Sequence, residues 1–254
     1  GVGGYESFAV VVTEEFPYIV QGSSPELMSM DQLPIRQGCV SKRSIASGEF
    51  GVVYASKDGL VAIGPGGNFS VVTDGYLSRD DWQALNPSSI HGCIHDGRYV
   101  AFYDTGTEQG GFILDPNHPE YGLTFLNWYA SATYPDPLAD SLFVVINNNE
   151  LVTWDTDAAA MLPYQWRSGP FKAPRPTSMS MARIYADDYD NLNFSLLADR
   201  GNGYETVYST PVLSGKPFRL PAGYYADKFK VELVGTSTVS RVDVAETASD
   251  LAAL

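Results

Sequence analysis

The chain has 254 residues, 44% of them hydrophobic and 18% charged, which is the balance of a folded protein with a sizeable core and excludes a disordered chain. Its formal net charge of −14 argues against proteins that read the grooves of nucleic acids, because such proteins gather Lys and Arg against the phosphates. No apolar run approaches the roughly 20 residues of a membrane-spanning helix.

Short strands joined by tight turns are predicted along most of the chain, since it holds 16 Tyr, 12 Phe, 24 Gly and 16 Pro. Helical periodicity is confined to residues 78–85 and 248–254. The alternation of apolar runs and turn residues predicts three hairpins, formed by residues 52–55 with 60–63, 99–103 with 112–114, and 142–146 with 151–154.

Each hairpin has one more candidate strand on either side, which gives three consecutive four-stranded units, the pattern of β-propeller blades. The flanking candidates are residues 40–46 and 69–73, then 90–95 and 123–127, then 129–133 and 164–167. The inner strands are apolar almost without alternation, as expected where neighbouring blades cover both faces. An earlier half-unit, residues 8–12 and 18–21, is assigned to another blade. Because a propeller needs at least four blades, either further blades lie upstream of Gly1 or these sheets pack in some open way, and we favour the first.

The blade rhythm ends near residue 166. Strands are predicted at 183–186, 194–198, 205–209, 229–234 and 239–245, and the alternation at 228–234 is typical of a strand with one wet face. The sequence therefore predicts an all-β protein. A partial β-propeller of about three four-stranded blades occupies residues 1–165, and a small antiparallel β-sandwich with a short C-terminal tail occupies residues 166–254.

Three metal-ligating side chains lie at alternate positions of one predicted strand, namely His91, Cys93 and His95. Such positions share a face, so the three could present ligands to zinc. A zinc site would need a fourth ligand, and the remaining histidine, His118, is not an apparent partner. We favour an ordinary blade strand without a metal. Cys39 and Cys93 could form one bridge at most, and we expect free thiols in a reducing compartment.

Residues 187–193 are rich in Asp and Asn, whose oxygens are ligands of the kind that calcium prefers. The spacing lacks the Gly at position 6 and the Glu at position 12 of an EF-hand loop. Turns rich in these residues arise from local hydrogen bonding alone, and a turn is the interpretation that we favour.

The run Ser56-Lys57-Asp58-Gly59 resembles the start of the Asp-box of sialidase-like propellers, but the aromatic residue that should follow the glycine is absent. We interpret it as a blade turn. No stretch points to the two facing carboxylates of a glycosidase, and no G-x-S-x-G, P-loop, Rossmann or H-E-x-x-H motif occurs. We therefore predict no catalytic residues, no metal and no cofactor.

Aromatic residues gather at Trp128-Tyr129, Tyr134, Tyr164-Gln165-Trp166 and Tyr224-Tyr225. They could stack on sugars or become buried against another subunit. Subunit contact is the function that we favour, because Tyr and Trp supply a large contact area at low entropic cost. The alternative is a carbohydrate-binding or glycan-cleaving propeller that recognises a host surface.

Several segments together resemble bacteriophage virion structural proteins of the tail hub or nozzle kind, also called tail tubular proteins. The resemblance rests on Trp166-Arg167-Ser168-Gly169-Pro170-Phe171, residues 218–223 and residues 231–246. Residues 17–26 and 53–61 resemble the propeller portion of the same proteins. Gly169 departs from the pattern, which has Lys at this position.

The resemblance implies a non-enzymatic part of a virion tail, assembled in the host cytoplasm. Such proteins form rings, six-fold in short-tailed phages, around the channel through which DNA leaves the capsid. The implied partners are copies of the chain, other tail proteins, and DNA that passes without sequence-specific binding. A negative channel wall would neither trap nor slow that DNA. The candidate subunit contacts are Trp166, Arg167, Phe171, Phe218, Arg219, Tyr224 and Tyr225.

Overall fold

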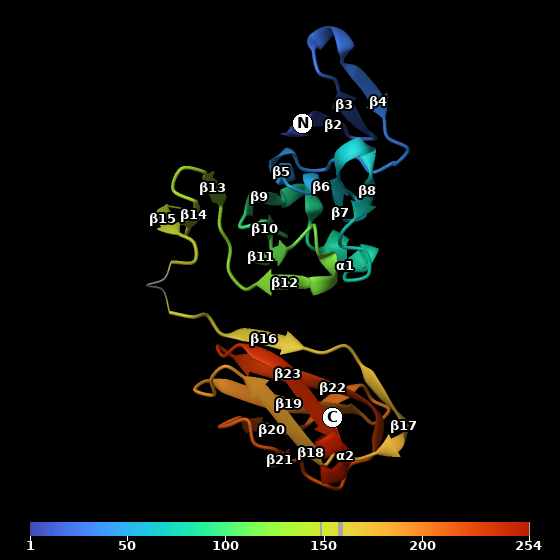
Figure 1. Cartoon of the computed structure of the whole chain (residues 1–254), viewed down its shortest axis with the longest axis vertical. Helices are drawn as coiled ribbons and strands as arrows, with labels where there is room; N and C mark the ends of the chain where they lie inside the picture. The colour runs from blue at the N-terminus through green and yellow to red at the C-terminus, as the bar shows by residue number, and fades with distance from the viewer. Residues whose placement is uncertain (148, 157–159, 254) are drawn as a thin grey trace. The chain divides into compact units, whose positions relative to one another are not determined.

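The computed structural model describes residues 1–147, 149–156 and 160–253. The chain is all-β and divides into two compact units, residues 1–157 (unit 1) and 158–254 (unit 2), shown in Figure 1. Neither of its two short α-helices, α1 (Arg79–Ala84) and α2 (Ala248–Ala253), is long enough to cross a membrane, nor is any other described helix.

Unit 1 consists of four consecutive antiparallel sheets that resemble propeller blades, and we number them sheets 1 to 4. In each sheet the strands pair in chain order. Sheet 1 contains β1 (Val2–Tyr5), β2 (Phe8–Val12), β3 (Pro17–Gln21) and β4 (Ser29–Gln32); sheet 2 contains β5 (Ala46–Gly48), β6 (Gly51–Ala55), β7 (Leu60–Ile63) and β8 (Phe69–Val71); sheet 3 contains β9 (His91–His95), β10 (Arg98–Asp104), β11 (Gln109–Leu114) and β12 (Leu123–Leu126); sheet 4 contains β13 (Ala132–Asp136), β14 (Ser141–Ile146) and β15 (Glu150–Thr153).

A separate apolar cluster fills the space between each pair of successive sheets. Strand β6 shows how this arrangement uses the sequence. Val52 and Tyr54 pack toward sheet 1, whereas Val53 and Ala55 pack toward sheet 3, and all four are fully buried. A strand covered on both faces has no wet side, which explains and confirms the predicted lack of alternation in the inner strands.

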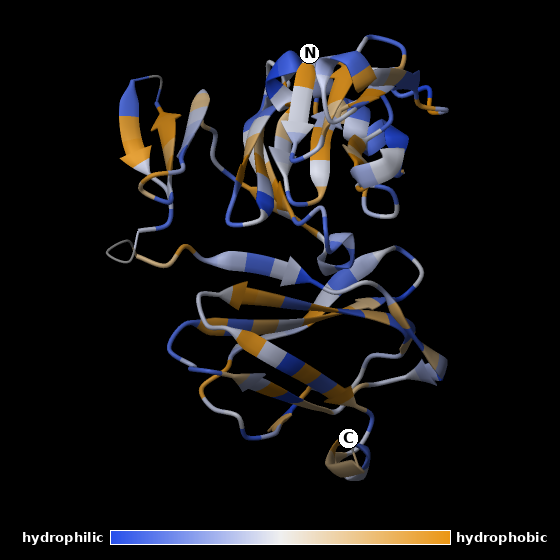
Figure 2. Cartoon of the chain, turned by 45° about the horizontal axis from the view of Figure 1, so that its top comes forward, coloured by the Kyte–Doolittle hydropathy of each residue, from blue (hydrophilic) through white to orange (hydrophobic). Residues whose placement is uncertain are grey.

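Unit 2 is a β-sandwich whose two sheets enclose one core. The larger sheet has the order β16 (Tyr164–Arg167), β22 (Ala226–Gly235), β19 (Leu192–Asp199), β20 (Tyr204–Pro211), with β17 (Phe171–Thr177) also paired to β22; the smaller sheet has the order β21 (Phe218–Arg219), β18 (Met181–Ala186), β23 (Val239–Ala245). Figure 2 shows hydrophobic and hydrophilic residues alternating along the strands of this unit. In β22 burial alternates from Lys228 to Gly235, as predicted for a strand with one wet face.

The three hairpins, the two helices and the blade pattern predicted from the sequence are confirmed. The structure changes the limits of two predicted units. The first unit begins at Ala46, because Lys42–Ser44 forms a 3₁₀ turn, and the supposed half-unit is a complete sheet once Val2–Tyr5 and Ser29–Gln32 are added. Residue 148, in the last predicted hairpin turn, and residue 254, at the end of the predicted tail helix, lie outside the described residues.

One strand assignment was wrong. Residues 164–167 were expected to complete the last blade, but Tyr164–Arg167 pairs with β22 in unit 2, from Tyr164 opposite Gly235 to Arg167 opposite Glu232. Sheet 4 therefore has three described strands. The physical reason is that a four-residue strand carries no local mark of its partner, so the sequence does not distinguish the preceding hairpin from a strand more than sixty positions later.

Candidate functional site

Strand β16 forms an open edge of the larger sheet of unit 2, because no described strand pairs with its outer side. Trp166 lies on this strand directly opposite Leu233, so the two side chains share the face that covers the core. Leu233 is buried, whereas Trp166 keeps 48% of its surface exposed. The structure thus places a large apolar ring at the margin of a core, beside backbone groups that have no partner in the described chain.

Arg167 is held within the sheet. Its Nε donates to Glu232 Oε2 at 2.8 Å, its Nη2 donates to the same oxygen, and Gln165 Nε2 adds a third donor at 2.9 Å. Partial burial would raise the pKa of Glu232, but the hydrogen bonds from Arg167 and Gln165 and the charge of Arg167 outweigh it and hold this pKa below its usual value. Arg167 remains half exposed, so its outer side is open to a second partner.

The seven predicted contact residues do not form one patch. Phe171 stacks on Phe229 in the larger sheet, while Phe218 and Arg219 belong to the smaller sheet, where the Phe218 ring meets Phe194 edge-on. Arg219 is exposed, and Tyr225 keeps 72% of its surface exposed.

Tyr224 requires a correction as a surface contact. Its ring is buried against Phe229, and its hydroxyl donates to the Met179 carbonyl at 2.8 Å. Burial also raises the pKa of this hydroxyl. The adjacent residues Tyr224 and Tyr225 therefore point to opposite sides, one into the core and one to solvent, and only Tyr225 is available to a partner.

Sequence reasoning missed a second exposed apolar surface, at the hairpin that joins β3 to β4 in sheet 1. Leu27, Met28 and Met30 lie close together in the chain and each exposes more than half of its surface. The signal was present as an apolar run within a polar turn region. Exposed methionines are common at surfaces that adapt to a partner.

The net charge is divided unequally between the units. Unit 1 holds 20 Asp and Glu against 6 Lys and Arg, whereas unit 2 holds 10 of each, so the whole excess of 14 negative charges belongs to unit 1. Between Arg98 and Arg167 the sequence contains no Lys or Arg at all. The acidity of the chain is thus confined to unit 1.

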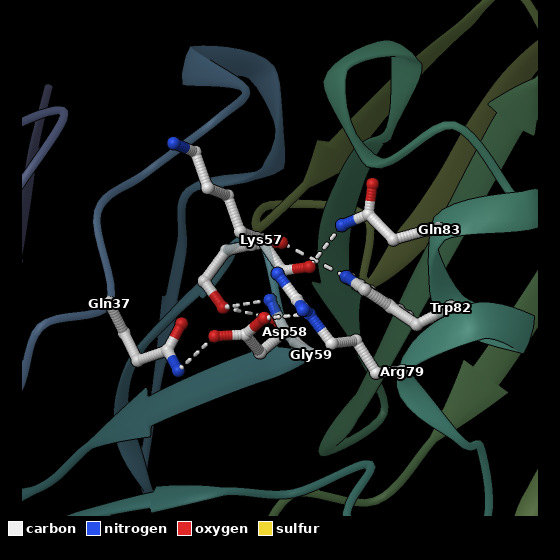
Figure 3. A network of polar contacts seen from close by, with 8 residues as sticks. Gln37, Lys57, Asp58, Gly59, Arg79, Trp82 and Gln83 are labelled. Carbon is white, nitrogen blue, oxygen red and sulfur yellow. Dashed lines mark hydrogen bonds and ion pairs between the residues drawn. The ribbon is translucent and has the colours of Figure 1, made fainter.

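The Ser56–Gly59 run forms the turn between β6 and β7, which confirms its interpretation as a blade turn. Helix α1 supplies the aromatic residue that the run itself lacks: Trp82 is buried and its indole Nε1 donates to the Ser56 carbonyl at 2.9 Å. Figure 3 shows Asp58 between two further donors, Gln37 Nε2 at 2.8 Å and Arg79 Nε at 2.6 Å. Both oxygens of the Asp58 carboxylate therefore accept a hydrogen bond from another side chain of unit 1.

The two candidate metal-binding runs show no converging ligands. Among the described residues, no three His, Cys, Asp or Glu side chains lie close enough to hold a metal ion. His91 and Cys93 are buried in sheet 3, and both cysteines are free, as predicted. In the Asp-rich run, Asp188 Oδ1 accepts a hydrogen bond from the Asp190 backbone, which is the local bonding of a turn. The same oxygen accepts a second, long-range bond from the Ser237 hydroxyl, 49 positions later.

No protein-family model matches the chain, and no curated protein matches it. Among solved structures, the chain is similar to an exo-β-1,3-galactanase from Phanerochaete chrysosporium, solved with galactose. The two share 9% sequence identity, the alignment covers 91% of this chain and 75% of that one, and the TM-score is 0.28. The likeness is distant and concerns the fold alone, in which several four-stranded antiparallel sheets resemble propeller blades.

Proposed function

We propose that this chain is a non-enzymatic structural part of a bacteriophage tail, of the hub or nozzle kind, which works by assembling with copies of itself into a ring around the channel through which DNA leaves. The observation that carries the proposal is the open edge at β16. It combines unpaired backbone groups with the half-exposed ring of Trp166, and such an edge is a template for pairing with another chain.

A ring built from identical subunits needs two different surfaces on each copy, because its contacts run from head to tail. The chain offers two apolar surfaces in different units. One is the β16 edge with Trp166, and the other is the β3–β4 hairpin with Leu27, Met28 and Met30. Contiguous exposed apolar patches on a protein surface commonly mark interaction sites.

The charge division supports the same assembly. A neutral unit 2 can meet the acidic unit 1 of the next copy without like-charge repulsion, while unit 1 supplies a wall that repels phosphates. The proposal therefore assigns the head-to-tail contact to the β16 edge of unit 2 and the β3–β4 hairpin of unit 1, and the channel wall to the rest of unit 1. A reconstruction of the assembled ring with a neutral or basic lumen would contradict this assignment.

The full chain tests the proposal by size-exclusion chromatography with light scattering and by native mass spectrometry. We expect one defined oligomer, and Trp166→Ala should weaken its association about 30-fold, since a central aromatic contact contributes about 2 kcal/mol or more. Leu213→Ala is the matched control, because Leu213 is an exposed apolar residue of the same unit away from the β16 edge. A strict monomer at high concentration, or equal losses in both variants, would refute the role of this edge.

A further inference from the structure

A cavity of about 590 Å³ lies between sheets 3 and 4 of unit 1. Its lining consists of Gln109, Trp128, Tyr129, Ser131, Ile146 and Asn147. Gln109 is the first residue of β11, Trp128 to Ser131 belong to the connection from β12 to β13, and Ile146 ends β14. The volume is within the range of about 300–1,000 Å³ that small-molecule sites occupy.

The aromatic wall of this cavity is held in place by neighbouring rings. Trp128 lies between Phe102 and Trp154, with ring centroids 5.2 and 5.3 Å away. Tyr129 meets Phe102 edge-on at 6.2 Å and His91 edge-on at 5.8 Å. Both residues are only half buried, so part of each ring remains open. The cavity therefore offers a preformed apolar wall whose shape costs little to order on binding.

The polar wall consists of two amides and a hydroxyl, and hydrogen bonds hold the Gln109 amide and the Ser131 hydroxyl. Gln109 Nε2 donates to Asp104 Oδ2 at 2.8 Å, which orients the amide and leaves its carbonyl oxygen as an acceptor. Asn147 occupies a left-handed backbone conformation with φ of 48° in the turn after β14. Ser131 donates from its hydroxyl to Val145, and its carbonyl accepts from Arg43 Nη2 at 2.8 Å.

We propose that this cavity binds one neutral sugar ring. A pyranose has a flat apolar face, which suits the Trp128 and Tyr129 rings, and hydroxyls that both donate and accept, which suits amides and a serine. None of the six lining side chains is charged. Two nearby charges, Asp104 and Arg43, are opposite in sign and already hydrogen-bonded to lining residues. Glu108 precedes Gln109 in the chain and Glu150 lies opposite Ile146, so the remaining charge near the cavity is negative.

His91 lies behind Tyr129 and is not itself part of the lining. The residue is buried, and neither ring nitrogen makes a hydrogen bond of full geometry within the described part of the chain, although the Ala130 and Ser89 backbones act on its charged form. Burial, aided by the positive charge of Arg43, lowers its pKa to about 4, so the ring is neutral at pH 7 and adds no charge behind the aromatic wall. Anionic ligands are disfavoured by the excess negative charge of unit 1.

The test titrates the full chain with the methyl glycosides of glucose, galactose and N-acetylglucosamine, followed by tryptophan fluorescence and saturation-transfer NMR. We expect saturable binding of at least one of them. Asn147→Gly and Gln109→Ala should each weaken it about fivefold, the effect of one hydrogen bond. Glycine tolerates the left-handed φ at position 147, so this variant removes the amide without backbone strain.

The control is Asn202→Gly, which removes an exposed turn asparagine in unit 2 and should leave binding unchanged. Absence of saturable binding at about 10 mM, a concentration that detects even millimolar affinity, would overturn the proposal. So would equal losses in the control, or preferential binding of glucuronic acid or thymidine over the neutral glycosides. Light scattering on the same samples keeps this result separate from the test of ring assembly.

Discussion

The two units bury their strands in different ways. In unit 1 the sheets are stacked face to face, so that a strand such as Gly51–Ala55 is buried at every residue. In unit 2 two sheets enclose one core, and β22 alternates between buried and wet positions. The comparison shows why apolar runs and alternating runs occur in one chain. A strand covered on both faces is apolar throughout, whereas a strand covered on one face alternates.

Charge follows the same division. Unit 1 carries the entire excess of negative charge, and unit 2 is balanced. All three histidines, His91, His95 and His118, also belong to unit 1. The two units should therefore respond differently to truncation, pH and salt, and hydrogen exchange resolved by unit can measure each response separately.

Among these substitutions, Trp82→Ala is expected to produce the largest difference in stability between the two units. Trp82 is almost completely buried, meets Phe112 edge-on and donates to the turn at Ser56. Its removal leaves a cavity and an unpaired carbonyl, and should lower the free energy of unfolding of unit 1 by about 3–5 kcal/mol. Exchange rates in unit 2 should stay constant. An equal rise in the hydrogen-exchange rates of both units would show that they unfold as one body, and would contradict their independent stability.

His91→Phe should change how the stability of unit 1 depends on pH. Burial, with Arg43, lowers the folded-state pKa of His91 from 6.5 to about 4. The unfolded chain therefore binds a proton before the folded one does, and stability falls as the pH drops from about 6.5 toward 4, by roughly 2–3 kcal/mol at the lower end.

Phenylalanine has no proton to gain and fits beside Phe102 and Tyr129. Chemical denaturation of both proteins at pH 7 and pH 4 measures the difference. His118→Phe is the control, because His118 is exposed and should give no such gain. A wild-type stability of unit 1 that declines no more than that of His91→Phe would contradict the assignment.

These effects depend on burial, and burial was only partly predictable from the sequence. The stacked sheets were predictable, because a run such as Val52-Val53-Tyr54-Ala55 has no polar position that could face water. The role of Trp82 was not. Its helix was expected, yet nothing local indicates that the indole reaches Ser56, 26 positions earlier. Long-range contacts of this kind depend on the fold as a whole.

The same limit accounts for the errors around the contact surface. Tyr164–Arg167 was joined to the nearest preceding hairpin, whereas its partner lies more than sixty positions later in the chain. Tyr224 and Tyr225 are identical neighbours in sequence, and the fold buries one and exposes the other. The charge division, in contrast, could be read from the sequence as soon as the boundary between the units was known.

Arg167→Ala tests how much the Arg167–Glu232 ion pair contributes to the stability of unit 2. The pair with Glu232 is half exposed on one side and largely buried on the other, so its loss should cost unit 2 about 1 kcal/mol at pH 7. The folded-state pKa of Glu232 is lowered, so this stabilisation exists above its unfolded pKa and is lost as the pH falls through the folded one. The variant and the parent should converge at acidic pH. Arg200→Ala is the control, because both partners of the Arg200–Glu205 pair are exposed, and a loss as large as that of Arg167→Ala would contradict the prediction.

The smallest expected effect is that of a single added charge. Thr124 in β12 and Thr206 in β20 are both exposed strand residues, one in each unit. Thr124→Lys places a cation in the stretch between Arg98 and Arg167 that has none, and should stabilise unit 1 by a few tenths of a kcal/mol by reducing self-repulsion. Thr206→Lys should give no gain, because unit 2 has no net charge to offset. Thermal unfolding at low and high salt measures both, and the gain should disappear at about 1 M salt, where charges are screened within about 3 Å. A gain that persists at high salt would come from packing, and equal gains in the two units would mean that the acidity of unit 1 does not act as a collective field.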